Sequence, residues 1–327
     1  MKWTRLKRIL VSAFVSLVIF FVISEISLQV YTRYVTYYDV EMARYASEVK
    51  IPSENPKIGH LHRSGVEKRL MNVAVRINSD GLRDREYDVP GGESYRIAAL
   101  GDSITFGWGV EQDETFESIL ETELNRVRPT EIVNFGTGNY NTEQQVNLFF
   151  EKGVKYRPDR IVVFYFINDA EPTPQRSKWA YLSRVRTLTF YWSRVRALLS
   201  RINPSRAYEN FYAELYGESE QGWVRARQAF VELRELCEEH TIGLQVFLLP
   251  DLHETRDYPF RGEHRKVMEF LEREGIDAVD LAPFFADQDD PRSLWVAPDD
   301  AHPNARGHEL IARYVYPFLA EEIAVRD

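Results

Sequence analysis

Five short apolar runs alternate with helical segments from residue 95 onward, and this alternation constrains the fold more than any other feature of the chain. The runs lie in YRIAALGDS, EIVNFGTGN, RIVVFYFIND, IGLQVFLLP and IDAVDL. Continuous apolar strands separated by helices are typical of a parallel sheet that is covered on both faces. The sequence therefore predicts an α/β fold with helical layers on both sides of one parallel sheet.

The N-terminal segment has the pattern of a membrane anchor. It begins with four basic residues, Lys2, Arg5, Lys7 and Arg8. An apolar run follows over residues 9–23 and continues to residue 30, long enough to span a bilayer if Glu25 reaches the headgroups. The basic residues would keep the N-terminus in the cytoplasm, so the rest of the chain would lie on the periplasmic or extracellular side. A cleavable signal peptide is the alternative, although Val22 and Ser24 offer only a poor cleavage site.

We predict three parts of the chain. Residues 1–30 form the cytoplasmic tip and transmembrane signal anchor, residues 31–94 a spacer and small β-rich lead-in, and residues 95–327 the α/β domain. An insertion at about 172–208 carries eight basic residues and no acidic one. Its helical spacing suits a basic amphipathic cover that lies on anionic lipid or guides an anionic substrate, or a helix packed on the sheet with its arginines in water.

Composition excludes several classes of function. With 41 basic and 50 acidic residues, the chain has a net charge of -9 and lacks the excess of basic residues typical of a protein that binds nucleic acid. The single cysteine, Cys237, excludes an intrachain disulfide and a cysteine-based metal cage, and its helical context favours a buried small side chain. His60 and His62 could hold a metal only with a third ligand, and none is in view. We therefore expect neither a metal nor an organic cofactor.

Three residues that could take part in catalysis follow successive predicted strands. If the strand order is the flavodoxin-like 2-1-3-4-5, the strand ends that carry Ser103, Gly138 and Asn168 share one crevice. Ser103 could attack an ester and supply its own backbone N–H to the developing oxyanion. Gly138 would add a second backbone N–H, and Asn168 a side-chain amide. These are the parts of an acyl-transfer site.

The base for such a site lies near the C-terminus in APDDAHPNARGH. Asp299 and His302 are three residues apart, so one turn would place the carboxylate against the imidazole and fix its tautomer. Asp300 is the alternative orienting carboxylate. His308 is a rival base, which we interpret as a packing or capping residue.

The blocks GDSITFG, NFGTGNYNT, FIND and DDAHPN, in this order, resemble the four blocks of the SGNH (GDSL) hydrolase superfamily. The resemblance covers roughly residues 95–320 and implies a flavodoxin-like α/β/α sandwich. It implies catalytic roles for Ser103, Gly138, Asn168 and His302, with Asp299 as the acidic partner. The anchor and RINSDGLRD are also similar to membrane-anchored bacterial members.

Two details depart from the family pattern or leave it open. The third block usually reads Gly-x-Asn-Asp, whereas this chain has Phe166 at the first position, which puts the shape of that loop in doubt. In the second block Gly136 competes with Gly138, and we prefer Gly138 because it precedes the polar continuation NYNT.

The resulting hypothesis is a serine esterase that hydrolyses carboxylic esters, such as O-acetyl groups on glycans or lipid esters, through an acyl-enzyme on Ser103. One alternative is an O-acyltransferase that passes the acyl group to a cell-surface glycan. An alternative of another class is a noncatalytic, membrane-anchored glycan-binding component. The oligomeric state is left open.

Overall fold

The computed structural model describes residues 2–31, 36–89, 92–173, 187–188, 190–192, 194–195, 204–288 and 290–325. Contacts divide the chain into two compact units, Met1–Glu48 with Arg176–Asn203, and Val49–Gln175 with Pro204–Asp327. The second unit contains the sheet. Most of the predicted insertion at 172–208 lies outside the described residues, so its predicted role stays a prediction.

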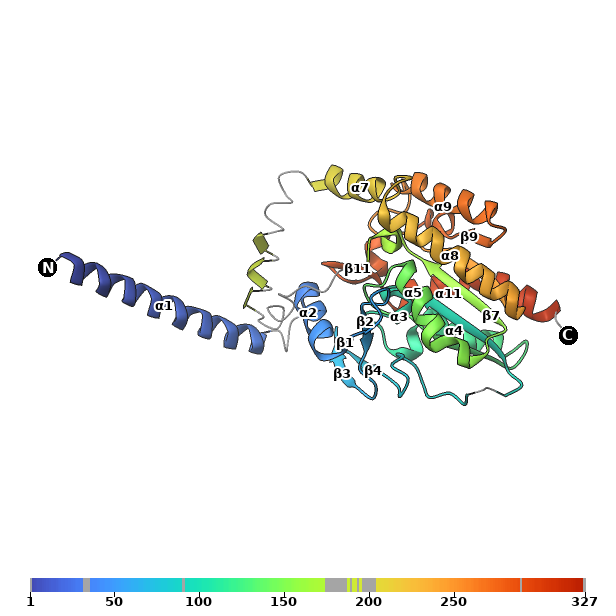
Figure 1. The fold of residues 1–327 in the computed structure, drawn as a ribbon, viewed down its shortest axis with the longest axis horizontal. Coiled ribbons are helices and arrows are strands. Elements are labelled where there is room, and N and C mark those ends of the chain that lie inside the picture. Colours follow the sequence, from blue (N-terminus) through green and yellow to red (C-terminus); the bar gives the residue numbers. More distant parts are fainter. Residues whose placement is uncertain are drawn as a thin grey trace. The chain divides into compact units, whose positions relative to one another are not determined.

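Figure 1 shows the fold as a ribbon. The second unit is built on a five-stranded parallel sheet with the order β6-β5-β7-β8-β9. The strands are β5 (Tyr95–Gly101), β6 (Thr130–Asn134), β7 (Arg160–Tyr165), β8 (Gly243–Leu248) and β9 (Asp277–Asp280). Numbered within the sheet, this is the predicted order 2-1-3-4-5. The five apolar runs thus supply the five strands, and the predicted fold class is confirmed.

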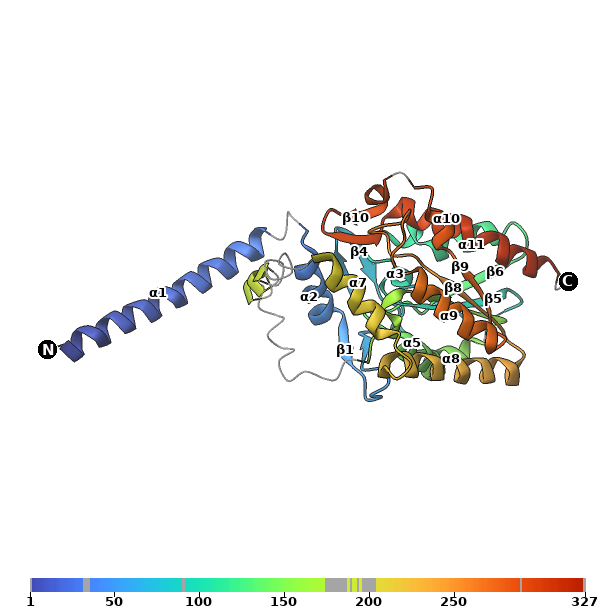
Figure 2. The same cartoon turned by 90° about the horizontal axis from the view of Figure 1, so that it is seen from above.

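Helices cover both faces of the sheet, because each strand is apolar on both faces. In β5, Ala98 and Leu100 pack into one core cluster, whereas Ile97 and Ala99 pack into another. The first cluster includes residues of α5 (Thr142–Leu148), α8 (Gln221–His240) and α9 (Arg261–Arg273), and the second includes residues of α4 (Phe116–Leu124) and α11 (Ala305–Val325). Figure 2 shows α5 and α8 on one side of the strands and α11 on the other. Cys237 is a buried residue of the first cluster, as predicted.

From residue 95 onward, this unit has further described elements outside the sheet. They are α3 (Ser103–Phe106), α7 (Pro204–Leu215), α10 (Ala282–Phe285), the antiparallel pair β10 (Trp295–Ala297) and β11 (Asp300–Pro303), and short turns of 3-10 or π-helix. Of these, α3 directly follows β5, and β11 directly precedes α11.

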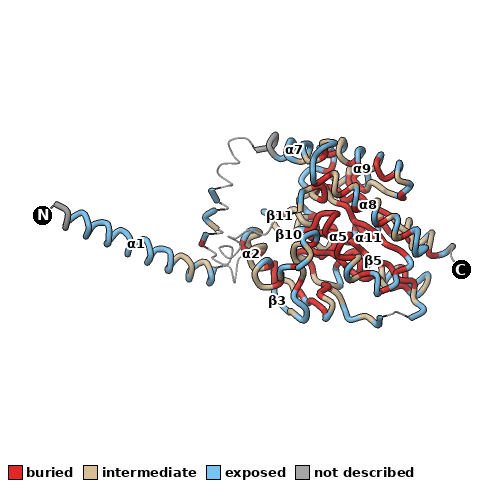
Figure 3. The backbone as a smooth tube through the Cα atoms, viewed as in Figure 1, coloured by how far each residue is buried: buried red, intermediate tan, exposed pale blue. Residues whose placement is uncertain are grey.

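The first unit contains α1 (Lys2–Tyr31) and α2 (Tyr38–Glu48). Within α1, Arg5–Tyr31 is long and apolar enough to cross a membrane, with a mean hydropathy of 2.6, and Figure 3 draws most of this helix as exposed. The same length and composition are found in signal sequences. Inside this unit the Glu25 carboxylate accepts hydrogen bonds of 2.8 Å from the backbone N–H and the hydroxyl of Thr187.

The predicted lead-in 31–94 divides between the two units. From Val49 onward it belongs to the unit of the sheet, where it forms two antiparallel hairpins. The first pairs β1 (Lys50–Pro52) with β2 (His60–His62), and the second pairs β3 (Glu67–Leu70) with β4 (Val73–Arg76). The part of the lead-in from Val49 onward therefore belongs to the α/β unit.

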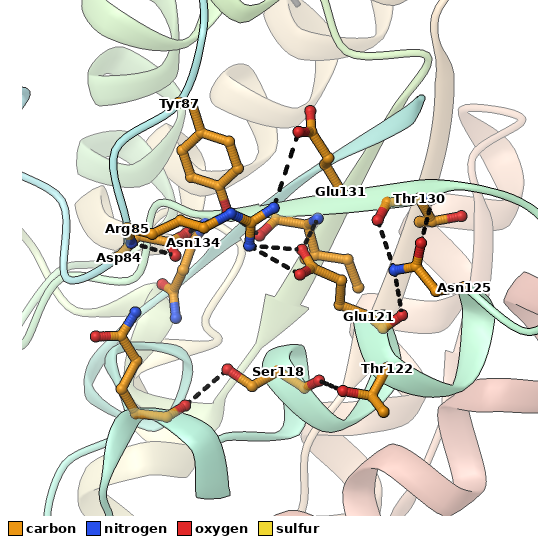
Figure 4. Close-up of polar contacts among 12 residues, drawn as sticks. Asp84, Arg85, Tyr87, Ser118, Glu121, Thr122, Asn125, Thr130, Glu131 and Asn134 are labelled. Carbon is orange, nitrogen blue, oxygen red and sulfur yellow. Dashed lines mark hydrogen bonds and ion pairs between the residues drawn. The ribbon is translucent and has the colours of Figure 1, made fainter. Parts of the chain in front are cut away.

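The end of the lead-in is fastened to β6 and α4 by polar contacts (Figure 4). Asp84 accepts a hydrogen bond of 2.8 Å from the backbone N–H of Asn134, and Arg85 pairs with Glu121 at 2.8 Å. The Tyr87 hydroxyl donates to Asp84 at 2.9 Å. These contacts connect the lead-in to the strand that precedes the Gly138 loop.

Candidate active site

Ser103 lies at the start of α3, directly after the first strand of the sheet. Asp102 is the N-cap of this short helix, and its carboxylate accepts a hydrogen bond of 2.9 Å from the backbone N–H of Ile104. The Ser103 side chain is buried, and its hydroxyl lies 3.4 Å from the other carboxylate oxygen of Asp102. The strand end and the cap therefore fix the backbone that carries the hydroxyl.

The structure brings Ser103 and His302 together across 199 positions of sequence, with 2.8 Å between Ser103 Oγ and His302 Nε2. The other ring nitrogen, His302 Nδ1, lies 2.5 Å from Asp300 Oδ1. Because a carboxylate only accepts hydrogen bonds, Nδ1 carries the proton and Nε2 is free to accept the one from Ser103. Hydroxyl, imidazole and carboxylate thus form one chain of hydrogen bonds.

The prediction that Asp299 orients His302 is wrong. The carboxylate that contacts His302 Nδ1 is that of Asp300. The prediction assumed a turn, in which residues three apart meet, but residues 300–303 form strand β11. Alternate residues of a strand face the same side, so Asp300 and His302 point together, whereas Asp299 lies in the turn before the strand. Asp300 is buried and Asp299 is exposed.

Trp108 is a partner of Asp300 that the sequence did not reveal. Its indole N–H donates to Asp300 Oδ2 at 2.9 Å, while Asp300 Oδ1 also accepts the backbone N–H of His302 at 3.1 Å. Both carboxylate oxygens are therefore held, which fixes the plane of the group that faces the imidazole. Trp108 stands five residues after Ser103 in GDSITFGWG, but nothing in that spacing predicts a bond to a residue near the C-terminus.

The charges around His302 make it a stronger base than an ordinary histidine. Burial lowers its pKa, but the hydrogen bond and charge of Asp300, together with the charges of Asp102 and Asp251, outweigh burial and raise the pKa above its usual value. For Asp300 the balance is reversed, since burial raises its pKa and the bonds from His302 and Trp108 lower it overall. The pair is therefore suited to hold an imidazolium next to a carboxylate.

Asn168 lies in a 3-10 turn, Ile167–Ala170, directly after β7. Its side-chain amide nitrogen is 3.3 Å from the Asp102 carboxylate, which places the amide beside the residue that precedes Ser103. Phe166 stands where the family usually has glycine, but its φ of -119° and ψ of 158° are extended values that any residue adopts. The departure from the family block therefore does not prevent this placement of Asn168.

Gly136 has a packing role in the loop after β6. Its backbone N–H donates to Asn134 Oδ1 at 2.7 Å, and a Cβ at this position would lie 2.2 Å from the backbone nitrogen of Phe106. Only glycine permits this approach between the loop and α3. The N–H of Gly136 is already used inside the loop.

Gly138 lies two residues farther along the same loop. The preceding residue, Thr137, donates its N–H to the carbonyl of Gly101 at 3.1 Å, so the loop is tied to the end of β5 two residues before Ser103. Ser103, Gly138 and Asn168 thus follow β5, β6 and β7, which are neighbours in the sheet.

The other histidines considered from the sequence have structural partners. His308 Nδ1 accepts the backbone N–H of Phe116 at 3.1 Å, and the two rings stack, so His308 packs and caps at the start of α4 as predicted. His60 Nε2 lies 3.1 Å from the carbonyl of Gly138, and His62 Nδ1 lies 3.1 Å from that of Gly81. In the part of the chain that the structure describes, no group of three or more metal-ligating side chains is found.

A comparison with protein families matches residues 99–310 to the GDSL-like lipase/acylhydrolase family. The chain belongs to this family. The matched region begins inside β5 and extends into α11, so it includes the strand ends, Ser103 and His302. The lead-in, residues 31–94, lies outside it. Among curated proteins, no sequence matches this GDSL-like hydrolase.

Comparison with solved structures finds proteins that are similar to this hydrolase at low sequence identity. They include LAE5, an alpha/beta hydrolase enzyme from the metagenome of Lake Arreo in Spain, with 17% identity, coverage of 71% of this chain and 97% of that chain, and a TM-score of 0.47. A catalytic mutant of Axe2, an acetylxylan esterase from Geobacillus stearothermophilus, has 17% identity, coverage of 69% and 94%, and a TM-score of 0.45.

Proposed function

We propose that this GDSL-like hydrolase is a serine esterase that cleaves carboxylic esters through an acyl-enzyme on Ser103. The observation that carries the proposal is the continuous chain from Ser103 Oγ to His302 Nε2, at 2.8 Å, and from His302 Nδ1 to Asp300, at 2.5 Å. These distances are those expected for a nucleophile, its base and the group that orients the base.

The proposed reaction has two halves. Ser103 Oγ attacks the ester carbonyl carbon while its proton moves to His302 Nε2, and the carbonyl oxygen becomes an oxyanion. Collapse of this intermediate breaks the bond to the alcohol, which leaves with the proton from His302. Water then attacks the acyl-enzyme, gives a proton to the same nitrogen, and the acid is released as Ser103 recovers the proton. Asp300 stabilises the imidazolium in both halves.

The oxyanion would be stabilised by three donors. These are the backbone N–H groups of Ser103 and Gly138 and the side-chain amide of Asn168. The position of all three after neighbouring strands supports this role, and so does the use of the Gly136 N–H inside its own loop. Fixed donors of this kind stabilise the charge that develops in the transition state without reorganisation.

We also propose that α1 anchors the enzyme in a membrane, with the N-terminus in the cytoplasm and the hydrolase unit on the periplasmic or extracellular side. The length and hydropathy of Arg5–Tyr31 support the anchor, and the basic residues that precede the apolar run support the orientation. Esters of acetylated glycans or lipids at that surface are the proposed substrates.

The test of the esterase is the Ser103→Ala variant of the full chain, assayed with 4-nitrophenyl acetate and with acetylated glycans. Turnover should fall by at least about 10³-fold, since removal of a triad nucleophile removes the covalent route. A fluorophosphonate should label the parent enzyme at Ser103 and leave the variant unlabelled. Full turnover by the variant would remove Ser103 from the mechanism. Acylation of an added sugar in place of water would identify a transferase instead.

A further inference from the structure

The first hairpin of the lead-in contacts the loop that carries Gly138. Lys50 Nζ donates to the Gly138 carbonyl at 2.9 Å and to the side-chain oxygen of Asn139 at 2.8 Å. His60 Nε2 lies 3.1 Å from the same carbonyl. The Tyr140 hydroxyl completes the contact by donating to the backbone carbonyl of His60. Two side chains separated from Gly138 by 88 and 78 positions therefore converge on one peptide oxygen.

The geometry of the hairpin explains why both donors reach the same atom. Lys50 pairs with His62 across the two strands, so His60 is a diagonal neighbour of Lys50 on the same face. A carbonyl oxygen only accepts, so His60 must carry its proton on Nε2 and donate it. A carbonyl has two lone pairs and can accept both bonds at once.

The loop itself needs such support. Glycine populates a wide range of backbone angles, so local sterics do not fix the direction of the Gly138 N–H. The next residue, Asn139, has a φ of 65°, in the left-handed region that asparagine adopts more readily than other residues with a side chain. The two bonds to the Gly138 carbonyl and the bond to the Asn139 side chain hold this part of the loop in one conformation.

We propose that Lys50 and His60 are positioning residues of the oxyanion hole. They hold the Gly138 carbonyl, and with the Thr137 carbonyl held by the Tyr140 N–H at 3.2 Å they fix the backbone angles of Gly138, whose N–H would point at the substrate oxygen. The inference rests on the proposed function, because it requires the Gly138 N–H to be an oxyanion donor. Both residues lie outside the region that matches the family, so the lead-in supplies part of the catalytic machinery of this hydrolase.

A stability measurement can distinguish a positioning role of Lys50 from a structural one, because the buried ammonium group lowers the stability of the fold. Burial lowers the pKa of Lys50 to about 7 from 10.5. The neighbouring His60 and His62, with pKa values lowered by burial to about 2 and about 3, are neutral near pH 7. Because the unfolded chain holds the Lys50 proton more tightly, the ammonium destabilises the fold at pH values below about 7, and this cost disappears as the pH rises from 7 to 10.5. Lys50→Met removes that charge.

The test compares variants of the full chain that remove a donor with variants that keep one. Lys50→Met and His60→Phe remove the donors, Lys50→Arg and His60→Gln retain them, and Lys57→Met is the control for loss of an exposed lysine from the same lead-in. We expect kcat for 4-nitrophenyl acetate to fall about 10- to 100-fold in the first pair, somewhat less than the loss of an oxyanion donor itself. KM should change by less than about threefold, as for an interaction made in the transition state.

The Tm of Lys50→Met at acidic pH should equal or exceed that of the parent, and the donor-retaining variants should recover kcat. A kcat of Lys50→Met and His60→Phe close to that of the parent would overturn the inference. A fall in kcat that follows a fall in Tm, or that Lys50→Arg and His60→Gln fail to reverse, would overturn it as well. Fluorophosphonate labelling of Ser103 in each variant distinguishes a failure of this inference from a failure of the proposed esterase function. A variant that is labelled but slow still has a reactive Ser103.

Discussion

Asp300 shows how one residue can decide the chemistry of a site through its place in a strand. Asp299 and Asp300 have identical side chains at adjacent positions, and it is the Asp300 carboxylate that lies 2.5 Å from His302 Nδ1. The alternation of side chains along β11 makes this choice, and Trp108 fixes it from the other side of the carboxylate.

The two carboxylates form a matched pair for mutation. Asp300→Asn should lower kcat by about 10³- to 10⁴-fold, because the amide cannot hold the same tautomer of His302 or stabilise its cation. Asp299→Asn should leave kcat within about twofold. Activity requires neutral His302 and is lost as the pH falls through its pKa. Since Asp300 raises that pKa, the acid limb of the residual activity should move to lower pH. Equal losses in the two variants would refute the assignment.

Some residues of the candidate site could be located from the sequence and others could not. Ser103, His302 and Asn168 stand next to strand ends or in short polar blocks, so pattern and resemblance both locate them. Asp300 was only an alternative, because the choice between a turn and a strand over DDAHP is a tertiary result. Lys50 and His60 bond to a backbone carbonyl far along the chain, and such contacts have no sequence signature.

At the scale of elements, the site depends on how closely the β6–α5 loop approaches α3. Gly136 permits this approach, since its missing Cβ would lie 2.2 Å from the backbone nitrogen of Phe106 and 2.4 Å from the carbonyl carbon of Thr105. Backbone atoms cannot move aside as the end of a flexible side chain can. The loop and α3 therefore have to be regarded as one packed unit around Ser103.

Gly136→Ala should destabilise the enzyme by about 3 kcal/mol, the upper range for overpacking a rigid site. Gly262→Ala is the control, because a Cβ there meets nothing within 4 Å and the residue lies in α9, where alanine is the better helix former. Urea denaturation should show a lower midpoint for the first variant and an unchanged or higher one for the second. An unchanged midpoint for Gly136→Ala would show that the loop can open without cost.

Other elements followed directly from the periodicity of the sequence. The five apolar runs became β5 to β9 in the expected order, because a strand buried on both faces must be apolar throughout. The start of the α/β unit could not be predicted from the sequence in the same way. Composition changes at residue 95, but contacts place the start of this unit at Val49, since the two hairpins pack on it.

At the scale of the whole molecule, the N-terminal helix determines where the esterase would work. Arg5–Tyr31 exceeds the roughly 20 residues that a bilayer requires. The anchor and the signal peptide make different predictions for the mature protein, because only the anchor keeps this helix.

The full chain should stay in the membrane pellet after an alkaline carbonate wash, and a variant that lacks residues 2–31 should enter the supernatant. Replacing residues 9–23 with leucine throughout is the control, since an anchor depends on apolar length and not on side-chain identity. Mature protein whose N-terminal sequence begins shortly after residue 24 would instead identify a cleaved signal peptide.

The position of Lys50 has a consequence for how this enzyme can be divided. It lies two residues after the end of α2, so the first residues of the sheet-containing unit are also the ones that contact the Gly138 loop. A fragment cut at the first strand of the sheet would contain every family block and still lack these contacts. If these contacts position the Gly138 loop as proposed, we expect the smallest active fragment to begin at Val49, and a fusion or domain graft should join the chain there.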